Sequence, residues 1–320
     1  METKKKGFPV AFWVCSCSEI FERLAYYLGC SLILIFVTAS VATGGLGLSD
    51  TVAANMQSNL TAFSYLLPLF GAVIVDKYIG ARYTTPVGMF IAAAGYFTGG
   101  IAKSATGVYV MIFLVSLGLA LFKNGAIIGR VITDKSQMDP AFSMRYTLVN
   151  VGTFLVGILY KDVFAKDGVL GFAPCFKMAA LMMVLGGLWY IFVCWRFLGD
   201  LGKLPFKKTL TEEEKAAEAK KKEETGTKQP LTTIEKKRIG AIFVASLFSI
   251  VFWIFWYLGY MPVYFYWAEN MDWVVAGYQV PSTWFDAANS LFCVILGPVT
   301  AALWKKLAAR PQGDMSLFRK

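Results

Sequence analysis

Long apolar stretches separated by short polar segments dominate the amino-acid sequence. Each stretch contains the roughly 20 residues that an α-helix needs to cross the hydrocarbon core of a bilayer. The pattern therefore predicts an all-α integral membrane protein with eight spans, of which the third has the least certain limits because Gly and Ala dilute its hydropathy. The predicted spans cover residues 8–41, 52–75, 83–101, 107–132, 143–164, 169–198, 239–267 and 280–304.

The composition agrees with this class of protein. Of the 320 residues, 57% are hydrophobic and only 16% are charged, which is too apolar for a soluble domain of this size. The net charge is +10, but the basic residues gather between the apolar runs, so we expect no nucleic-acid partner. The six cysteines all fall in predicted spans and histidine is absent, so we expect neither a metal site nor a cofactor. The first apolar run is too long and too charged for a cleavable signal peptide.

The basic residues also predict the orientation, because cytoplasmic loops carry an excess of Lys and Arg. One side of the predicted spans carries only Lys103, Lys161 and Lys166. We expect both termini on the other, cytoplasmic side, in a bacterial inner (cytoplasmic) membrane. Besides the charged segment 199–238, that side carries Lys4, Lys5, Lys6, Lys77, Arg82, Arg130, Lys135, Arg145, Lys305, Lys306, Arg310, Arg319 and Lys320.

The charged segment divides the chain into three predicted domains. Residues 1–198 form an N-terminal bundle of six transmembrane helices, residues 199–238 a cytoplasmic linker, and residues 239–320 two further helices with a cytoplasmic tail. Within the linker, a capping-box pattern at Thr211 and Glu214 opens a run rich in Ala, Lys and Glu that extends to Glu224. This run predicts an amphipathic helix at the cytoplasmic membrane surface, and a solvated tether is the alternative interpretation.

Ionisable residues interrupt the first span. Glu19, Glu22, Arg23 and Tyr26 recur at helical spacing and therefore share one face. Charges at membrane depth are costly, so these side chains must turn toward one another or toward a watered cavity. Lys123 in the fourth span needs a carboxylate for the same reason, and Glu22 or Glu19 is the expected partner. The alternative is a purely structural cluster of ion pairs.

Neutral polar residues in other spans offer further hydrogen-bonding groups. A peptide zwitterion carries a carboxylate, an ammonium and backbone amides, which suit a lysine, a glutamate, and tyrosine or asparagine side chains respectively. For each tyrosine taken singly, packing or an interfacial ring is the simpler interpretation. The neutral candidates are Tyr26, Tyr27, Tyr65, Asn150 and Asn289.

A second motif lies between the second and third spans. It contains Gly71, Asp76, Gly80 and Arg82, and short acidic-basic loops of this kind are typical of major facilitator transporters. Glycines permit close helix approach and tight turns, and the charged side chains can pair with neighbouring helix ends.

Taken together, these motifs resemble the proton-coupled oligopeptide transporter (POT) family of the major facilitator superfamily. The resemblance runs in order along nearly the whole chain. Its motifs are Glu19-x-x-Glu22-Arg23-x-x-Tyr26-Tyr27, Gly45-Leu46-Gly47-Leu48-Ser49-Asp50, Tyr65-Leu66, Asp76, Gly80-Ala81-Arg82, Phe122-Lys123, Ala141-Phe142-Ser143, Asn150-Val151-Gly152, Phe285-Asp286-Ala287-Ala288-Asn289 and Pro298.

The resemblance implies two pseudo-symmetric six-helix bundles around a cavity for di- or tripeptides, with a proton-driven rocking cycle. Glu19, Glu22, Arg23 and Lys123 match the family's protonation-sensitive network. Tyr26, Tyr27, Tyr65, Asn150 and Asn289 match positions that line the peptide site, and Gly71, Asp76, Gly80 and Arg82 match its conformational motif.

Four substitutions and the length of the chain depart from the family pattern. Tyr257 stands where the family has an acidic residue, Cys30 where it often has a second arginine, and Leu24 and Leu28 where it has phenylalanine and glycine. The sequence ends at Lys320, after the eighth predicted span, so the second bundle is expected to be incomplete. We then expect a separately encoded fragment, a second copy or an unrelated membrane chain to cover the charged faces.

Two functional hypotheses follow. The first is a proton-coupled di- and tripeptide symporter, truncated and partly degenerate, whose partners are membrane lipid, a small peptide and protons. The second is a non-transporting accessory or structural subunit of a larger membrane complex, derived from a peptide transporter. An enzyme is not expected, because the sequence contains no nucleophile–base pair, phosphate-binding loop or metal cluster.

Overall fold

The computed structural model describes residues 7–134, 137–159, 171–205, 232–258, 266, 270–280, 283–308 and 310. The chain divides into two compact units, the first comprising Met1–Thr209 with Thr283–Lys320 and the second Leu210–Ser282. The last helix therefore groups with the N-terminal bundle, whereas the sequence places it with residues 239–320. The predicted helix between Thr211 and Glu224 lies outside the described residues, and the three predicted domains stay a prediction.

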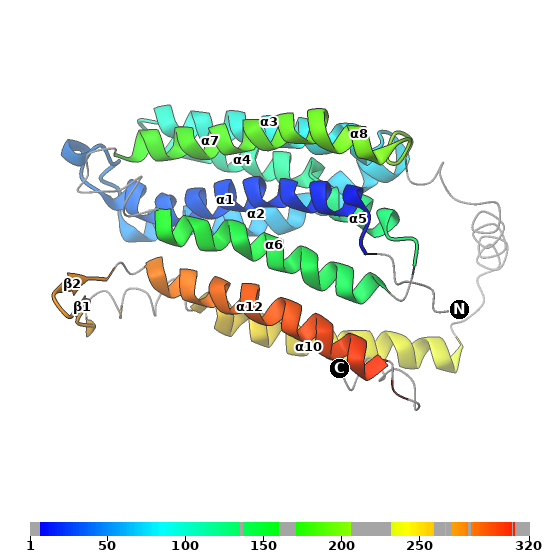
Figure 1. Ribbon diagram of the computed structural model, residues 1–320. Coiled ribbons are helices and arrows are strands. Elements are labelled where there is room, and N and C mark those ends of the chain that lie inside the picture. The colour runs from blue at the N-terminus through cyan, green and yellow to red at the C-terminus, as the bar shows by residue number, and fades with distance from the viewer. Residues whose placement is uncertain are drawn as a thin grey trace. The chain divides into compact units, whose positions relative to one another are not determined.

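Helices make up almost all of the first unit (Figure 1). The one-turn helix η1 (Val41–Thr43) lies in the connection after the first helix, and most of the other described connections between these helices are short. The helices are α1 (Val10–Thr38), α2 (Asp50–Lys77), α3 (Ala81–Ile101), α4 (Ala105–Leu121), α5 (Asn124–Val131), α6 (Met138–Leu159), α7 (Phe172–Trp189), η5 (Tyr190–Cys194), α8 (Trp195–Leu198) and α12 (Thr283–Ala308).

The second unit contains the long helix α10 and a small hairpin. Helix α10 (Thr233–Leu258) begins with a capping box, in which Thr232 Oγ1 accepts from the Glu235 amide and Glu235 Oε2 accepts from the Thr232 amide. The hairpin pairs β1 (Val274–Val275) with β2 (Tyr278–Gln279) in antiparallel register. Positive φ angles at Ala276 and Gly277 make the turn between the two strands.

Within the residues that the structure describes, two of the predicted spans differ from regular helices. The fourth is broken at Phe122 and Lys123, where the backbone leaves the helical region between α4 and α5. The sixth contains the π-helical turn η5 between α7 and α8. In the described residues, six helices are long and apolar enough to cross a membrane, and α3 and α6 are not among them. Both are long enough, at 21 and 22 residues, so their crossing stays a prediction.

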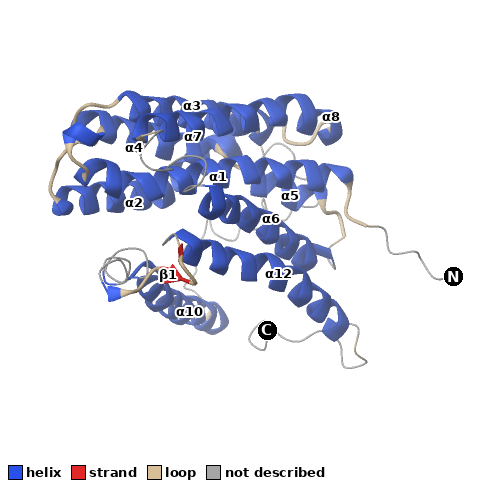
Figure 2. Cartoon of the chain, turned by 60° about the vertical axis from the view of Figure 1, so that its left-hand side comes forward, coloured by secondary structure: helices blue, strands red, loops and turns tan. Residues whose placement is uncertain are grey.

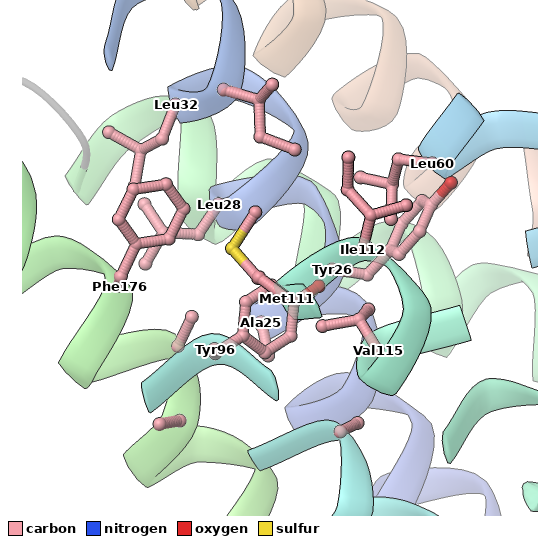
Figure 3. Close-up of a cluster of buried hydrophobic side chains, with 14 of the residues drawn as sticks. Ala25, Tyr26, Leu28, Leu32, Leu60, Tyr96, Met111, Ile112, Val115 and Phe176 are labelled. Carbon is pink, nitrogen blue, oxygen red and sulfur yellow. The ribbon is translucent and has the colours of Figure 1, made fainter. Parts of the chain in front are cut away.

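The main hydrophobic core lies between α1, α2, α3, α4 and α7. Helix α3 packs on α4 and α7, and α1 packs on α2, α6 and α7. Figure 3 shows part of this core: Leu28 and Leu32 of α1 lie on the side of Phe176 of α7, and Tyr26 of α1 lies on the side of Leu60 and Ile112. Helix α12 lies alongside α6 at the edge of the unit (Figure 2). The core therefore fixes the inner face of α1, which carries the ionisable residues.

Candidate functional site

The two glutamates of α1 turn into the bundle. Glu19 and Glu22 are each only 1% exposed, as the cost of placing carboxylates at membrane depth predicts. Helix packing leaves α1 between α6 on one side and α2 and α7 on the others, so both carboxylates meet protein rather than lipid. The expected inward orientation of this face is confirmed.

Glu22 is held by the residue that follows it. Nε and Nη2 of Arg23 donate to the two carboxylate oxygens of Glu22, each at 2.5 Å. Cζ of Arg23 also lies 5.0 Å from the ring centroid of Tyr26 and 5.9 Å from that of Tyr27, within the range of a cation–π interaction. Glu22, Arg23 and the two rings therefore form one contiguous cluster of charge and aromatic surface.

Glu19 has two partners that the sequence motifs do not predict. Its Oε1 atom accepts from Nε of Arg145 at 2.8 Å and from Nδ2 of Asn124 at 3.0 Å. The same Nδ2 donates to the Cys15 carbonyl at 2.7 Å, so Asn124 joins the start of α5 to α1. Glu19 is therefore the point at which α1, α5 and α6 meet.

The sequence pattern places Arg145 with the cytoplasmic basic residues, because it lies only two residues after the start of the predicted fifth span at residue 143. Helix α6 begins at Met138, so Arg145 lies about two turns inside it. The sequence contains one signal for the pairing of Arg145 with Glu19. Glu19 needs a cation, and Arg145 is a basic residue within the predicted fifth span.

The prediction that Lys123 pairs with Glu22 or Glu19 is wrong. Among the described residues, its ammonium forms no ion pair with Glu19 or Glu22 and donates instead to the Pro68 carbonyl of α2 at 2.8 Å. The break between α4 and α5 places Lys123 outside regular helix, which aims its side chain at α2. Each glutamate already has a guanidinium within hydrogen-bond distance, so neither needs the lysine.

The structure does not gather the five predicted peptide-binding residues at one surface. Tyr26 is 9% exposed and packs into the hydrophobic core, whereas Tyr27 is half-buried and close enough to Tyr65 for their hydroxyl groups to interact electrostatically. The ring of Tyr65 is 63% exposed. Asn150 of α6 is buried and donates to the Tyr146 carbonyl at 2.9 Å, and Asn289 of α12 is exposed.

The glycines of the second motif allow close backbone contacts. A Cβ atom on Gly71 would lie 2.0 Å from the Ala120 carbonyl oxygen, so α2 and α4 touch there without intervening side chains. A Cβ atom on Gly80 would lie 2.1 Å from the Gly202 carbonyl oxygen. Asp76, one turn beyond Gly71, is close enough to Lys123 to act on its charge.

Arg82 caps the end of the sixth span, as expected for a cation near a helix C-terminus. Its guanidinium donates to the carbonyl of Trp195 at 3.0 Å and to that of Gly199, and it lies over the Trp195 ring at 5.2 Å. The Trp195 indole nitrogen donates back to the Arg82 carbonyl at 3.1 Å. Arg82 is only 9% exposed, so this contact ties the start of α3 to α8 inside the protein.

These features define a class: an integral membrane protein of helices, with buried charges on its first helix and a charged motif between its second and third. Comparison with known proteins narrows the class. The sequence profile of the POT family (PTR2) matches residues 203–320. The chain is similar to the peptide transporters of that family, and the resemblance indicated by its motifs is confirmed.

Curated relatives match nearly the whole chain. It is 23% identical to the uncharacterized transporter YclF of Bacillus subtilis, with 95% of this chain and 69% of that protein covered. It is 22% identical to the di-/tripeptide transporter of Lactococcus lactis subsp. cremoris, with 98% and 72% covered. A third relative, the dipeptide and tripeptide permease A of Pectobacterium carotovorum, is 26% identical over 62% of this chain and 38% of its own length.

Solved structures show the fold. The crystal structure of peptide transporter POT in complex with sulfate superposes with a TM-score of 0.72 at 24% identity, covering 96% of this chain and 71% of that one. A POT family transporter in complex with 5-aminolevulinic acid gives a TM-score of 0.69 at 21% identity, covering 96% and 72%. The predicted all-α, major facilitator-like membrane fold is therefore confirmed.

Proposed function

We propose that this chain is a proton-coupled symporter of di- and tripeptides. The observation that carries the proposal is the ion pair between the buried Glu22 and the partly buried Arg23, which lies against Tyr26 and Tyr27. The names of the relatives support the peptide as substrate, because they include a di-/tripeptide transporter and a dipeptide and tripeptide permease. The comparisons support this transporter interpretation and give no support to the accessory subunit.

A proton on Glu22 supplies the coupling. The ionised carboxylate accepts both hydrogen bonds of the Arg23 guanidinium, and protonation removes the charge that holds this bidentate pair. Arg23 is then free to donate to acceptor groups of the substrate, such as the backbone carbonyl groups of a peptide. Each proton that moves down the membrane potential releases about 2.3 kcal/mol per 100 mV, which is sufficient for modest accumulation of a peptide.

The remaining predicted residues take supporting roles in this proposal. Hydroxyl and amide groups for binding the peptide come from Tyr26, Tyr27, Tyr65, Asn150 and Asn289. Those that are buried in this structure reach the peptide in another conformation of the transport cycle. Lys123 takes part in proton coupling when it leaves the Pro68 carbonyl. Gly71, Asp76, Gly80 and Arg82 connect helices that move during the cycle.

We further propose a bacterial inner membrane with both termini on the cytoplasmic side, since most Lys and Arg residues outside the spans fall on that side. Apolar side chains exposed along α2, such as Leu69 and Phe70, contact lipid or another membrane chain. A reporter enzyme that is active only in the cytoplasm, fused after Lys320, tests the orientation. An inactive fusion protein that is nevertheless inserted would contradict it.

The transport proposal is tested with purified protein in liposomes. With an inward proton gradient, labelled Ala-Ala is expected to accumulate inside, and dissipation of the gradient with a protonophore is expected to abolish accumulation. Uptake that is the same with and without the gradient would overturn proton coupling. Absence of both uptake and Ala-Ala binding would overturn the peptide substrate.

A further inference from the structure

Arg145 reaches Glu19 through a gap left by a glycine. Its Nε atom donates to Oε1 of Glu19 at 2.8 Å, and its guanidinium passes directly over Gly125 at the start of α5. A Cβ atom on Gly125 would lie 3.1 Å from Nη2 and 3.2 Å from Cζ of Arg145. The ring centroid of Phe142, one turn earlier on α6, lies 5.7 Å from Cζ of Arg145. Figure 1 shows α1, α5 and α6 adjacent to one another at this end of the unit.

Among the described residues, only the Nε edge of this guanidinium forms a hydrogen bond with protein. An arginine carries five N–H donors, and Arg145 uses the one on Nε. Within the described part of the chain, its Nη atoms donate to no protein acceptor, and the side chain is 30% exposed. The free Nη pair has the planar geometry that binds a carboxylate through two parallel hydrogen bonds.

The Oε2 atom of Glu19, the carboxylate that binds Arg145, can accept a proton. Oε2 of Glu19 and Oδ1 of Asn124 are both buried and, among the described residues, have no hydrogen-bond partner. The two groups are neighbours, because Nδ2 of Asn124 lies 3.0 Å from Oε1 of Glu19. Two acceptors cannot bond to each other, and a buried polar atom without a partner is costly. A proton on Oε2 converts that oxygen into a donor, and Oδ1 of the neighbouring Asn124 is an acceptor without a described partner.

We propose that Arg145 is a binding residue for the carboxylate of the peptide, and that the protonation state of Glu19 controls its availability. This assignment rests on the proposed transport function. While Glu19 is ionised, it holds Arg145 by a charge-assisted hydrogen bond and neutralises its charge. When a proton from the external solution binds Oε2 of Glu19, the guanidinium is left uncompensated and binds the peptide carboxylate. Release of that proton to the cytoplasm restores the ion pair and displaces the peptide.

The surroundings of Glu19 favour this control. The charged groups that act on it are Arg145 from α6 and Glu22 from its own helix, and α5 contributes the neutral Asn124. The charge of Glu22 is already met by Arg23, and Lys123 at the α4–α5 break is engaged with Pro68. From the side of α7, Trp189 donates to the Val14 carbonyl and adds no charge. Arg145 is therefore the cation whose binding depends on Glu19.

The test compares two probes that differ only in the group Arg145 would bind. Uptake and binding of Ala-Ala and of its C-terminal amide are measured in liposomes at about pH 5.5 and about pH 8, so that the preference for the free acid is compared at two proton concentrations. Arg145→Gln is expected to weaken Ala-Ala binding roughly 10- to 100-fold and to leave binding of the amide unchanged. Arg145→Lys is expected to restore part of the preference for the free acid.

Two further variants keep the test independent of folding. The double variant Glu19→Gln/Arg145→Gln removes both charges of the pair together, so it leaves no uncompensated carboxylate, and it is expected to show the same loss of preference. Lys103→Gln removes one positive charge from an exposed loop and is expected to behave as wild type. If wild type binds both probes equally, or if Arg145→Gln and the double variant both keep its preference for the free acid, this assignment is overturned while the proposed function stands. If wild type neither binds nor transports either probe, both are overturned.

Discussion

The Lys123 ammonium lies 2.8 Å from the Pro68 carbonyl oxygen, and this hydrogen bond joins the break between α4 and α5 to the middle of α2. The lysine is thereby kept apart from Glu19 and Glu22, which bind Arg145 and Arg23 instead. The same part of α2 is in backbone contact with α4 at Gly71. In this conformation, Lys123 therefore contributes to the packing of α2 on α4 rather than to the charge network of α1.

Replacing Lys123 tests this packing role. Lys123→Met removes the donor to Pro68 and is expected to lower the free energy of unfolding by about 0.5–1.5 kcal/mol, the usual net contribution of one hydrogen bond. Lys123→Gln keeps a donor and should lose less. Thermal unfolding in detergent gives the comparison. A loss in the Met variant far above this range would instead indicate that Lys123 compensates a buried carboxylate.

The contact at Gly71 predicts a strong effect of a larger side chain. Gly71→Val places a Cβ atom against the Ala120 carbonyl, so α2 and α4 must separate, at a cost of about 1–3 kcal/mol for overpacking. The control is Gly240→Ala in α10, where a Cβ atom would meet nothing within 4 Å. That control is expected to be neutral or slightly stabilising, because Ala favours helix over Gly. Equal melting temperatures for Gly71→Val and wild type would rule out the close contact.

Arg82 is expected to be a stabilising cap of the sixth span. Arg82→Ala removes donors to two carbonyls and the contact with the Trp195 ring, and should cost roughly 1.5–3 kcal/mol per charged hydrogen bond, with the larger loss if both carbonyls become unsatisfied. Arg82→Lys should recover only part of this, since an ammonium cannot reproduce the fork of a guanidinium. Full recovery by Lys, measured as the unfolding temperature in detergent, would show that charge alone suffices.

Outside the membrane helices, the hydrogen bond and the charge of Lys203 lower the pKa of Asp200. A carboxyl whose pKa is lower in the folded than in the unfolded state adds stability above its unfolded pKa, and that stability is lost as the pH falls through the folded pKa. Asp200 is fully exposed, so the effect is expected to be small. Asp200→Asn should leave the melting temperature near pH 7 almost unchanged and slightly flatten its fall toward pH 3. A large destabilisation at pH 7 would contradict this.

Glu22 carries the central chemistry of the proposed cycle. Glu22→Gln cannot ionise, so proton-driven accumulation of labelled Ala-Ala is expected to be lost, whereas exchange of internal for external peptide without a gradient should persist. Asp50→Asn, which removes an exposed carboxylate at the start of α2, is the control and should accumulate peptide normally. Undiminished gradient-driven accumulation in Glu22→Gln would remove Glu22 from the mechanism.

The sequence predicts the membrane helices and the inward face of α1 because both depend on the cost of exposing polar groups to lipid. Glu19 and Glu22 are buried for this reason alone. The contact of Arg82 with a helix end is predictable too, since the cation follows a short loop between two spans.

The pairing of the charges was not predictable in the same way. It depends on where α4 breaks, how α5 and α6 are rotated about their axes, and which cation lies closest to each carboxylate. Arg145 lies two turns inside α6 only because that helix begins at Met138, and apolar periodicity does not fix a helix start to within a few residues. Lys123 turns toward Pro68 because the backbone leaves the helix at that point, and the hydropathy pattern does not indicate this break.

The most direct test of the central claim is proton movement driven by a peptide gradient. Purified protein is reconstituted in liposomes that contain a trapped pH-sensitive dye, with equal pH on both sides, and Ala-Ala is added outside. Proton-coupled symport through the charge network of α1 predicts acidification of the interior with wild type and none with Glu22→Gln. Entry of labelled Ala-Ala without any change in internal pH would contradict it.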